Sequence, residues 1–335
     1  MHAHWIPAGL TDALRRRATP PNIVKLDDGR ETMGVAGFSV PLTPGFDDPA
    51  TRLAEMDRHG IQRGVLSLTT VYGVESLPVA DAEPLCRAFN DAVSQMCADH
   101  PDRFSGLASL PQAEVGAAVA EFERAMDLPG MVGALLLGDG FLSRQRAEQF
   151  RPLFEAANRR GAILLVHYGM LADDPKAPKP DASDNSGARM ATLDMQARLS
   201  SNMVTFCLTD FLEAFPNVTV LSHNLGGNIP FEIERMDHRA LVAHPDAEVP
   251  SRKFKESRVM VDCNSFGARG IELAVGFWGA RRIVLGTDGT DFGMKWSQDA
   301  IAEANISEAD KRAILHDNAA RVLAPFLNRT AAAAE

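Results

Sequence analysis

Histidine and aspartate side chains end several apolar runs of this chain, and these residue types bind metal ions. His167, His223 and Asp288 each end such a run, and His2 and His4 are two positions apart near the first residue. In an extended strand, residues i and i+2 point to the same face, so His2 and His4 can offer two imidazoles to one ion. Imidazole nitrogen and carboxylate oxygen suit Zn²⁺ and also Mn²⁺ or Fe²⁺. The pattern therefore indicates a metal site.

Each of these residues also has a structural interpretation. A His-x-His pair near a terminus is also found in tags, and a single histidine at a strand end is commonly a hydrogen-bonded structural group. Asp288 is followed by Gly289, a pair that also forms turns. The metal hypothesis rests on the coincidence that these polar residues all end strands that are otherwise apolar.

The elements that must position these residues alternate along the chain. Helical patterns separate short apolar runs of strand length, and such runs are typical of strands covered on both faces of a parallel sheet. The runs cover residues 64–69, 104–110, 132–137, 162–167, 218–223, 259–264 and 283–288, and the helical patterns cover 50–59, 83–99, 115–126, 145–159 and 307–323. Ser307 and Asp310 come close to a helix-capping box. The alternation predicts right-handed βαβ units.

With residues 1–5 as an eighth strand, the pattern predicts a (β/α)₈ TIM barrel whose active site lies at the carboxyl ends of the strands. An open doubly wound sheet is the alternative, but its glycine-rich phosphate fingerprint is absent from the first strand–helix turn. Proline-rich residues 6–49 predict an insertion after the first strand, and residues 171–189 predict a polar loop. We expect one barrel over residues 1–330, with 6–49 as an insertion subdomain and 331–335 as a frayed tail.

The amino-acid composition argues against some classes of function. The 335 residues include 34 Lys and Arg against 44 Asp and Glu, and the net charge of −10 argues against a nucleic-acid partner. The four cysteines form no Cys-x-x-Cys pair, which favours free thiols in a reducing compartment and hence a cytoplasmic location. We expect no secretory segment and no membrane association, because no uncharged apolar run reaches the roughly 18 residues of a spanning helix.

The set of motifs resembles the amidohydrolase superfamily, and within it the decarboxylase branch that contains aminocarboxymuconate semialdehyde decarboxylase and γ-resorcylate decarboxylase. The matching segments are specific to this branch only as a set and run through nearly the whole chain: residues 2–7, 86–90, 100–104, 164–167, 221–227, 235–239, 285–288 and 317–321.

The resemblance implies a (β/α)₈ barrel with one divalent metal ion, Zn²⁺ first and Mn²⁺ as the alternative. By position, His2, His4, His167 and Asp288 match the metal ligands, and His223 matches the catalytic histidine beside the metal. Asp288 is expected to share the proton transfer with His223. The resemblance also implies a homodimer or a larger homo-oligomer.

A small carboxylic acid is the expected substrate class. Arg235 and Arg239 are the candidates for clamping a second carboxylate, and Trp5 and Phe292 are the candidates for walling the substrate. The structural alternatives are solvated helix charges for the arginines and core packing for the aromatic residues.

Three hypotheses of function remain. The first is a metal-dependent, non-oxidative decarboxylase of an aromatic or dienoic acid. The second is a hydrolase or hydratase of a lactone, amide or unsaturated acid on the same site, with Asp288 as the base. The third is a barrel that has lost its metal and serves as a binding or regulatory protein.

Two departures from the family pattern affect the histidines expected at the metal site. Only Met1 precedes His2, whereas several residues usually lie before the first histidine of the family. Either the first strand is clipped, in which case it would hold His2 and His4 poorly and weaken metal binding, or the assigned start of the chain lies too far downstream. Asn224 is an extra residue between His223 and the following Leu-Gly-Gly, and it is expected to shift the loop beside the catalytic histidine.

Overall fold

Eight parallel strands form the central sheet of the computed structural model, which describes residues 2–35, 37–43, 45–174, 183, 185–264, 266–289 and 294–332. In spatial order the strands are β1 (Ala3–His4), β5 (Gly64–Ser67), β6 (Phe104–Ala108), β7 (Met131–Leu137), β8 (Ile163–His167), β9 (Thr219–Ser222), β10 (Met260–Asp262) and β11 (Ile283–Val284). A parallel bridge between His2 and Gly286 joins the first strand to the last and closes the ring. The predicted TIM-barrel fold is thereby confirmed.

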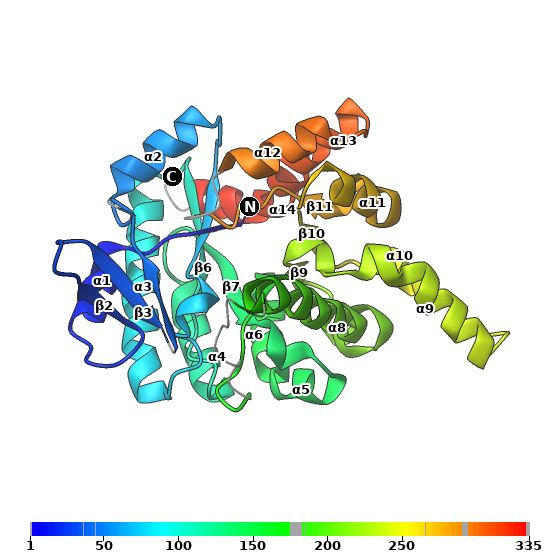
Figure 1. Ribbon diagram of the computed structural model, residues 1–335, viewed down its shortest axis with the longest axis horizontal. Coiled ribbons are helices and arrows are strands. Elements are labelled where there is room, and N and C mark those ends of the chain that lie inside the picture. The colour runs from blue at the N-terminus through cyan, green and yellow to red at the C-terminus, as the bar shows by residue number, and fades with distance from the viewer. Residues whose placement is uncertain are drawn as a thin grey trace.

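Helices follow the strands and cover the outside of the barrel (Figure 1). They are α1 (Ala8–Arg15), α2 (Pro49–Arg58), α3 (Val79–Asp99), α4 (Val115–Met126), α5 (Arg144–Gln149), α6 (Arg151–Arg160), α7 (Ser186–Ala188), α8 (Met195–Leu208), α9 (Ile229–Ala243), α10 (Pro250–Glu256), α11 (Ala268–Trp278), α12 (Met294–Glu303), α13 (Glu308–Arg312) and α14 (Asn318–Ala332). Among the described residues, no helix combines the length and the apolar character needed to cross a bilayer.

Burial on both faces explains why the apolar runs form strands. Every residue of β7 and of β8 is buried, as expected for a parallel sheet covered by helices. Side chains that point inward form their own cluster, which includes Val65, Leu165 and Val284, and Leu323 and Phe326 of α14 pack against it. The barrel interior is therefore a packed core, as in other barrels of this type, whose active sites lie at the rim.

The segment between β1 and α2 carries a separate small sheet. It consists of the antiparallel strands β2 (Asn22–Lys25), β3 (Glu31–Val35) and β4 (Phe38–Pro41). Next to this sheet, α1 packs against α3. These elements occupy the range that the prolines marked as an insertion, while the division into a barrel and a subdomain remains our proposal.

Two long helices that the periodicity predicted are each interrupted in the structure. Residues 145–159 form α5 and α6, which meet at Phe150 because Pro152 starts a new helix within its first turn. Residues 307–323 form α13 and the start of α14, joined by a wide helical turn at Ala313–Asp317. Ser307 caps α13 as expected, accepting the N–H of Asp310 at 3.1 Å. Of the loop predicted at 171–189, residues 175–182 and 184 lie outside the described residues, and Ser186–Ala188 form α7. Of the predicted frayed tail, residues 333–335 lie outside the described residues, and 331–332 belong to α14.

A buried carboxyl group near β5 yields a test of the fold. Glu75 is fully buried, and its Oε1 accepts a hydrogen bond from Ser109 Oγ at 2.8 Å. Burial raises the pKa of Glu75 to about 7 from 4.5. The folded state then holds a proton between these two pH values that the unfolded state releases, so unfolding free energy falls as pH rises through this window.

We predict that Glu75→Gln removes this pH dependence. Between pH 4 and pH 8 the unfolding free energy of the variant should rise relative to the wild type by about 3 kcal/mol. Urea unfolding across the pH range measures the difference, and Glu303→Gln on the exposed surface of α12 serves as the control. Parallel pH profiles for the wild type and Glu75→Gln would contradict the burial of an uncompensated carboxyl group.

Candidate metal centre

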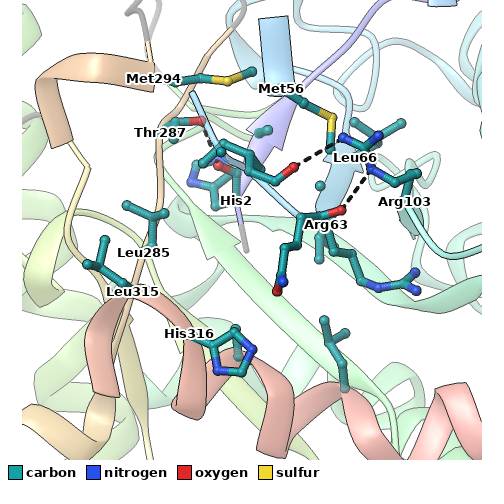
Figure 2. Close-up of a pocket in the computed structure, with 18 of the residues that line it drawn as sticks. His2, Met56, Arg63, Leu66, Arg103, Leu285, Thr287, Met294, Leu315 and His316 are labelled. Atoms are coloured by element: carbon teal, nitrogen blue, oxygen red, sulfur yellow. Dashed lines mark hydrogen bonds between the residues drawn. The ribbon is translucent and has the colours of Figure 1, made fainter. Parts of the chain in front are cut away.

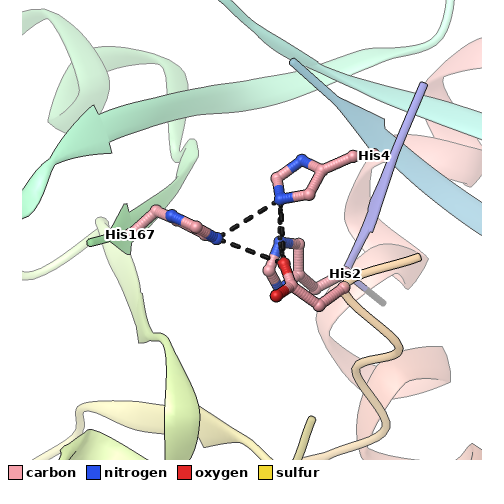
Figure 3. Close-up of side chains that lie close together, drawn as sticks. His2, His4 and His167 are labelled. Carbon is pink, nitrogen blue, oxygen red and sulfur yellow. Dashed lines mark hydrogen bonds and ion pairs between the residues drawn. The ribbon is translucent and has the colours of Figure 1, made fainter. Parts of the chain in front are cut away.

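Four side-chain atoms from three separate parts of the chain converge at the carboxyl ends of the strands. They are the Nε2 atoms of His2, His4 and His167 and the Oδ1 atom of Asp288. Figure 3 shows the three labelled rings pointing toward one another, His4 from β1, His167 from β8 and His2 from the residue before β1. The structure therefore brings together all four residues that the sequence analysis assigned as metal ligands.

The spacing of these atoms fits a cation between them. Nε2 of His4 lies 3.3 Å from Nε2 of His2 and 3.3 Å from Nε2 of His167. Oδ1 of Asp288 lies 2.9 Å from His4, 3.3 Å from His167 and 3.5 Å from His2. A tetrahedral ion with ligand distances of about 2.0–2.1 Å separates its donor atoms by about 3.3–3.4 Å. The donor set thus has the size and chemistry of a divalent-metal site.

The other nitrogen of each ring has a partner that fixes its orientation. Nδ1 of His2 lies 3.0 Å from Oδ2 of Asp262, and Nδ1 of His4 lies 3.1 Å from Ser67 Oγ. Nδ1 of His167 lies 2.9 Å from the carbonyl oxygen of Tyr168 and 3.1 Å from Thr70 Oγ1. A ring that donates its Nδ1–H outward keeps the lone pair of Nε2 for a metal.

Protonation states in the cluster match those that metal ions require. Burial lowers the pKa of His2, and burial with the nearby His223 lowers the pKa of His167 to about 3. Burial alone would raise the pKa of Asp288, but His223, His167 and His4 hold it well below its usual value. The two histidines are thus neutral and the aspartate is ionised at neutral pH, which are the forms that bind metal.

His223 lies beside the four donor atoms and between two carboxylates. Its ring stacks on His167 with the centroids 3.9 Å apart, its Nδ1 is 3.4 Å from Asp262 Oδ2, and its Nε2 is 4.0 Å from Asp288 Oδ2. Burial opposes a charge on His223, but Asp262 and Asp288 outweigh it and raise its pKa. His223 is therefore the histidine of this cluster best suited to carry a proton.

Asp262 is the residue of this centre that the sequence analysis missed. It is fully buried at the end of β10, and His223 and His2 hold its pKa below the usual value against the effect of burial. A carboxylate within an otherwise apolar strand was the available signal. Gly286 makes its position possible, because a Cβ there would lie 2.9 Å from the Cβ of Asp262.

Left-handed backbone conformations occur where β9 and β11 lead into the site. Asp288 has φ 50°, and Asn224 and Leu225 have φ values of 53° and 55°. Such conformations are unfavourable for residues other than glycine and are found mostly at functional sites. The N–H of Asn224 donates to Asp262 Oδ1 at 3.1 Å, so the extra residue after His223 is tied to the centre.

Of the four proposed substrate-binding residues, the structure describes Arg235, Arg239 and Trp5. Arg235 and Arg239 are exposed on α9, which projects from the barrel (Figure 1). Trp5 is buried in the main hydrophobic core, with 3% of its surface exposed. Phe292 lies outside the described residues. The roles assigned to these four residues remain predictions.

A family profile described as Amidohydrolase matches residues 1–324. The chain belongs to the amidohydrolase family. It is 26% identical over 295 residues to the γ-resorcylate decarboxylase of Rhizobium radiobacter, covering 83% of this chain and 87% of that one. It is also 26% identical over 247 residues to the 2-amino-3-carboxymuconate-6-semialdehyde decarboxylase of Dictyostelium discoideum, covering 72% and 66%. The resemblance to the decarboxylase branch is confirmed.

A solved structure shares the fold of this amidohydrolase. It is a dihydroxybenzoic acid decarboxylase from Polaromonas sp. JS666, crystallised with manganese and the inhibitor 2-nitroresorcinol. The two chains match with a TM-score of 0.65 and 24% identity, covering 83% of this chain and 85% of that one.

We predict that Asp262→Asn weakens metal binding about 10- to 100-fold, because it removes the charged acceptor that orients His2. Competition of the chelator-stripped protein with a metal-sensitive dye measures the dissociation constant. Asp317→Asn is the matched control, since Asp317 accepts from Nδ1 of His316 at 2.9 Å on the exposed surface. Equal affinities of Asp262→Asn and the wild type would contradict the orienting role of Asp262.

Proposed function

We propose that this protein is a metal-dependent, non-oxidative decarboxylase of a small aromatic carboxylic acid. The observation that carries the proposal is the convergence of three imidazoles and one carboxylate beside His223, in a chain similar to γ-resorcylate decarboxylase. Of the earlier alternatives, a hydrolase or hydratase would use the same metal site, whereas a metal-free binding or regulatory protein would not. Both are outcomes of the experiment below.

The assignment of ligands and metal is part of this proposal. His2, His4, His167 and Asp288 would hold one divalent ion. When bound, the ion supplies Lewis-acid chemistry and a fixed point for a substrate oxygen. Nitrogen and oxygen donors serve both Zn²⁺ and Mn²⁺, and the manganese in the related Polaromonas structure makes Mn²⁺ the first ion to test.

His223 acts as the proton donor in the proposed reaction. It transfers a proton to the ring carbon that carries the carboxylate, and Asp262 and Asp288 stabilise its charged form beforehand. The bond between that carbon and the carboxylate then breaks, CO₂ leaves, and the bonding electrons stay on the ring. His223 takes a new proton from water, so one proton is consumed for each CO₂ released.

The remaining parts of the proposal concern recognition and assembly. Arg235 and Arg239 bind a second acidic group of the substrate, and Trp5 and Phe292 contact its ring. A homodimer or larger homo-oligomer is supported by the exposed apolar residues of α9, where Phe231 is 76% and Val242 is 63% exposed. We also propose a cytoplasmic location.

The decisive experiment combines metal reconstitution with a panel of substrates. Chelator-stripped protein is reloaded with Mn²⁺ or Zn²⁺ and incubated in D₂O with hydroxybenzoic acids, including 2,6-dihydroxybenzoate. We expect metal-dependent CO₂ release with one deuterium entering the ring. Turnover of esters or lactones without CO₂ would establish the hydrolase instead. Failure to bind either metal would favour the third hypothesis, a metal-free binding or regulatory protein.

We predict that His223→Gln lowers kcat at least about 100-fold, the usual contribution of a general acid. Metal content should stay at the wild-type level, because His223 is outside the four-donor set. Steady-state kinetics and elemental analysis on the same preparation separate the two effects. A kcat within threefold of the wild type would remove His223 from the proton transfer.

A further inference from the structure

A buried arginine outside the donor set contacts the backbone of two proposed ligand segments. Arg52 belongs to α2, and only 9% of its surface is exposed. Its Nη2 donates to the carbonyl oxygen of His4, and its Nη1 and Nη2 lie 3.3 Å and 3.5 Å from the carbonyl oxygen of Gly289. One carbonyl belongs to a ligand on the first strand, and the other directly follows the ligand Asp288.

No carboxylate neutralises Arg52 within the described part of the chain, where its head group donates only to these carbonyl oxygens. Burial lowers the pKa of Arg52 to about 10, which leaves the guanidinium charged at neutral pH. Burying a charge without a counter-ion is unfavourable, so such an arrangement needs a compensating role. The planar fork of a guanidinium can bind two carbonyls at once, which the ammonium of a lysine does poorly.

The contacts of Arg52 lie where β1 and β11, the two end strands of the sheet, are joined by one isolated bridge. β1 pairs with β5 at two positions only, Ala3 with Leu66 and His4 with Ser67. On the other side, β1 meets the residues after β11 through the His2–Gly286 bridge and two backbone hydrogen bonds: His4 N–H donates to the carbonyl oxygen of Gly289 at 3.1 Å, and Thr287 N–H to that of His2 at 2.9 Å. Thr287 Oγ1 also donates to the carbonyl oxygen of His2 at 3.3 Å. We call this junction of β1 with β11 the seam.

A cavity of about 890 Å³ lies along the seam, and its lining includes His2 and Ala3 together with Leu285 and Thr287. Figure 2 shows His2 and Thr287 in one part of the cavity wall and Leu315 and His316 in another. Arg52 also lines this cavity. The ligands on β1 are therefore held by few backbone hydrogen bonds, by the outer partners of their rings and by Arg52.

We propose that Arg52 is a positioning residue of the metal centre, which sets the separation of His4 and Asp288 across the seam by binding the carbonyls of His4 and Gly289. The inference rests on the proposed function in one respect, since it takes His4 and Asp288 as ligands of one ion. Their donor atoms are 2.9 Å apart, and that distance depends on how β1 lies against the end of β11.

Arg63 offers a matched control within the same cavity wall. Its Nη1 donates to the carbonyl oxygen of Phe104 at 2.7 Å and its Nη2 to that of Pro101 at 2.8 Å. Both arginines thus bind backbone carbonyls, but the contacts of Arg63 are to β6 and the residues before it. Replacing Arg63 should reduce thermal stability without changing the geometry of the metal ligands.

The experiment measures Mn²⁺ affinity of chelator-stripped wild type, Arg52→Met, Arg52→Lys and Arg63→Met, together with thermal unfolding with and without Mn²⁺. We expect the dissociation constant to rise about 10- to 100-fold for Arg52→Met, as for other groups that orient ligands. Arg52→Lys, which reaches one carbonyl, should lie between Arg52→Met and the wild type. Arg63→Met should bind Mn²⁺ with the affinity of the wild type, even if its Tm is lowered as much as that of Arg52→Met.

The outcomes separate the inference from the proposed function. If the wild type binds Mn²⁺ and both Arg52 variants bind it within twofold, Arg52 is only structural and the inference is overturned. If Arg52→Met fails to fold, Arg52→Lys decides by the same criterion. If Arg63→Met loses as much Mn²⁺ affinity as Arg52→Met, general destabilisation of the cavity wall explains the loss, and the inference is overturned. If the wild type binds neither Mn²⁺ nor Zn²⁺, the proposed metal centre fails, and the role of Arg52 fails with it.

Discussion

The close approach of three imidazole nitrogens and one carboxylate oxygen is the interaction on which this account depends. Lone pairs placed 2.9–3.5 Å apart repel one another unless a cation lies between them. The surroundings maintain this approach by giving every ring an acceptor on its far side. Burial lowers the pKa of His2 and of His167 and so keeps these two imidazoles neutral. A divalent ion meets all of these conditions together.

The barrel serves this centre by bringing distant parts of the chain to one rim. His2 and Asp262 are separated by 260 positions and still approach to 3.0 Å, since β1 and β10 flank β11 in the closed ring. Parallel strands all place their carboxyl ends at the same edge of the barrel, so residues at the ends of different strands lie close together there. The net charge of −10 says little about this edge, where the nearest charges would be those of the ion, Asp262, Asp288 and protonated His223.

Much of the fold and the four proposed metal ligands were predictable because they follow local rules. Apolar runs such as 132–137 fit only strands covered on both faces, and the two-residue spacing of His2 and His4 fixes their common side. Asp262 and Arg52 were not found, because their roles depend on contacts between segments far apart in sequence. The apolar periodicity also did not predict the helix breaks at Phe150 and near Ala313. A new helix can begin inside a continuous apolar stripe without changing its spacing.

The most direct test of the central claim is X-ray absorption at the metal edge of the Mn²⁺-loaded or Zn²⁺-loaded protein. The account predicts a first shell of nitrogen and oxygen atoms only, with outer-shell scattering from three imidazole rings. A shell containing sulfur, or one of oxygen atoms without imidazole scattering, would contradict the assignment of His2, His4, His167 and Asp288 as the metal centre.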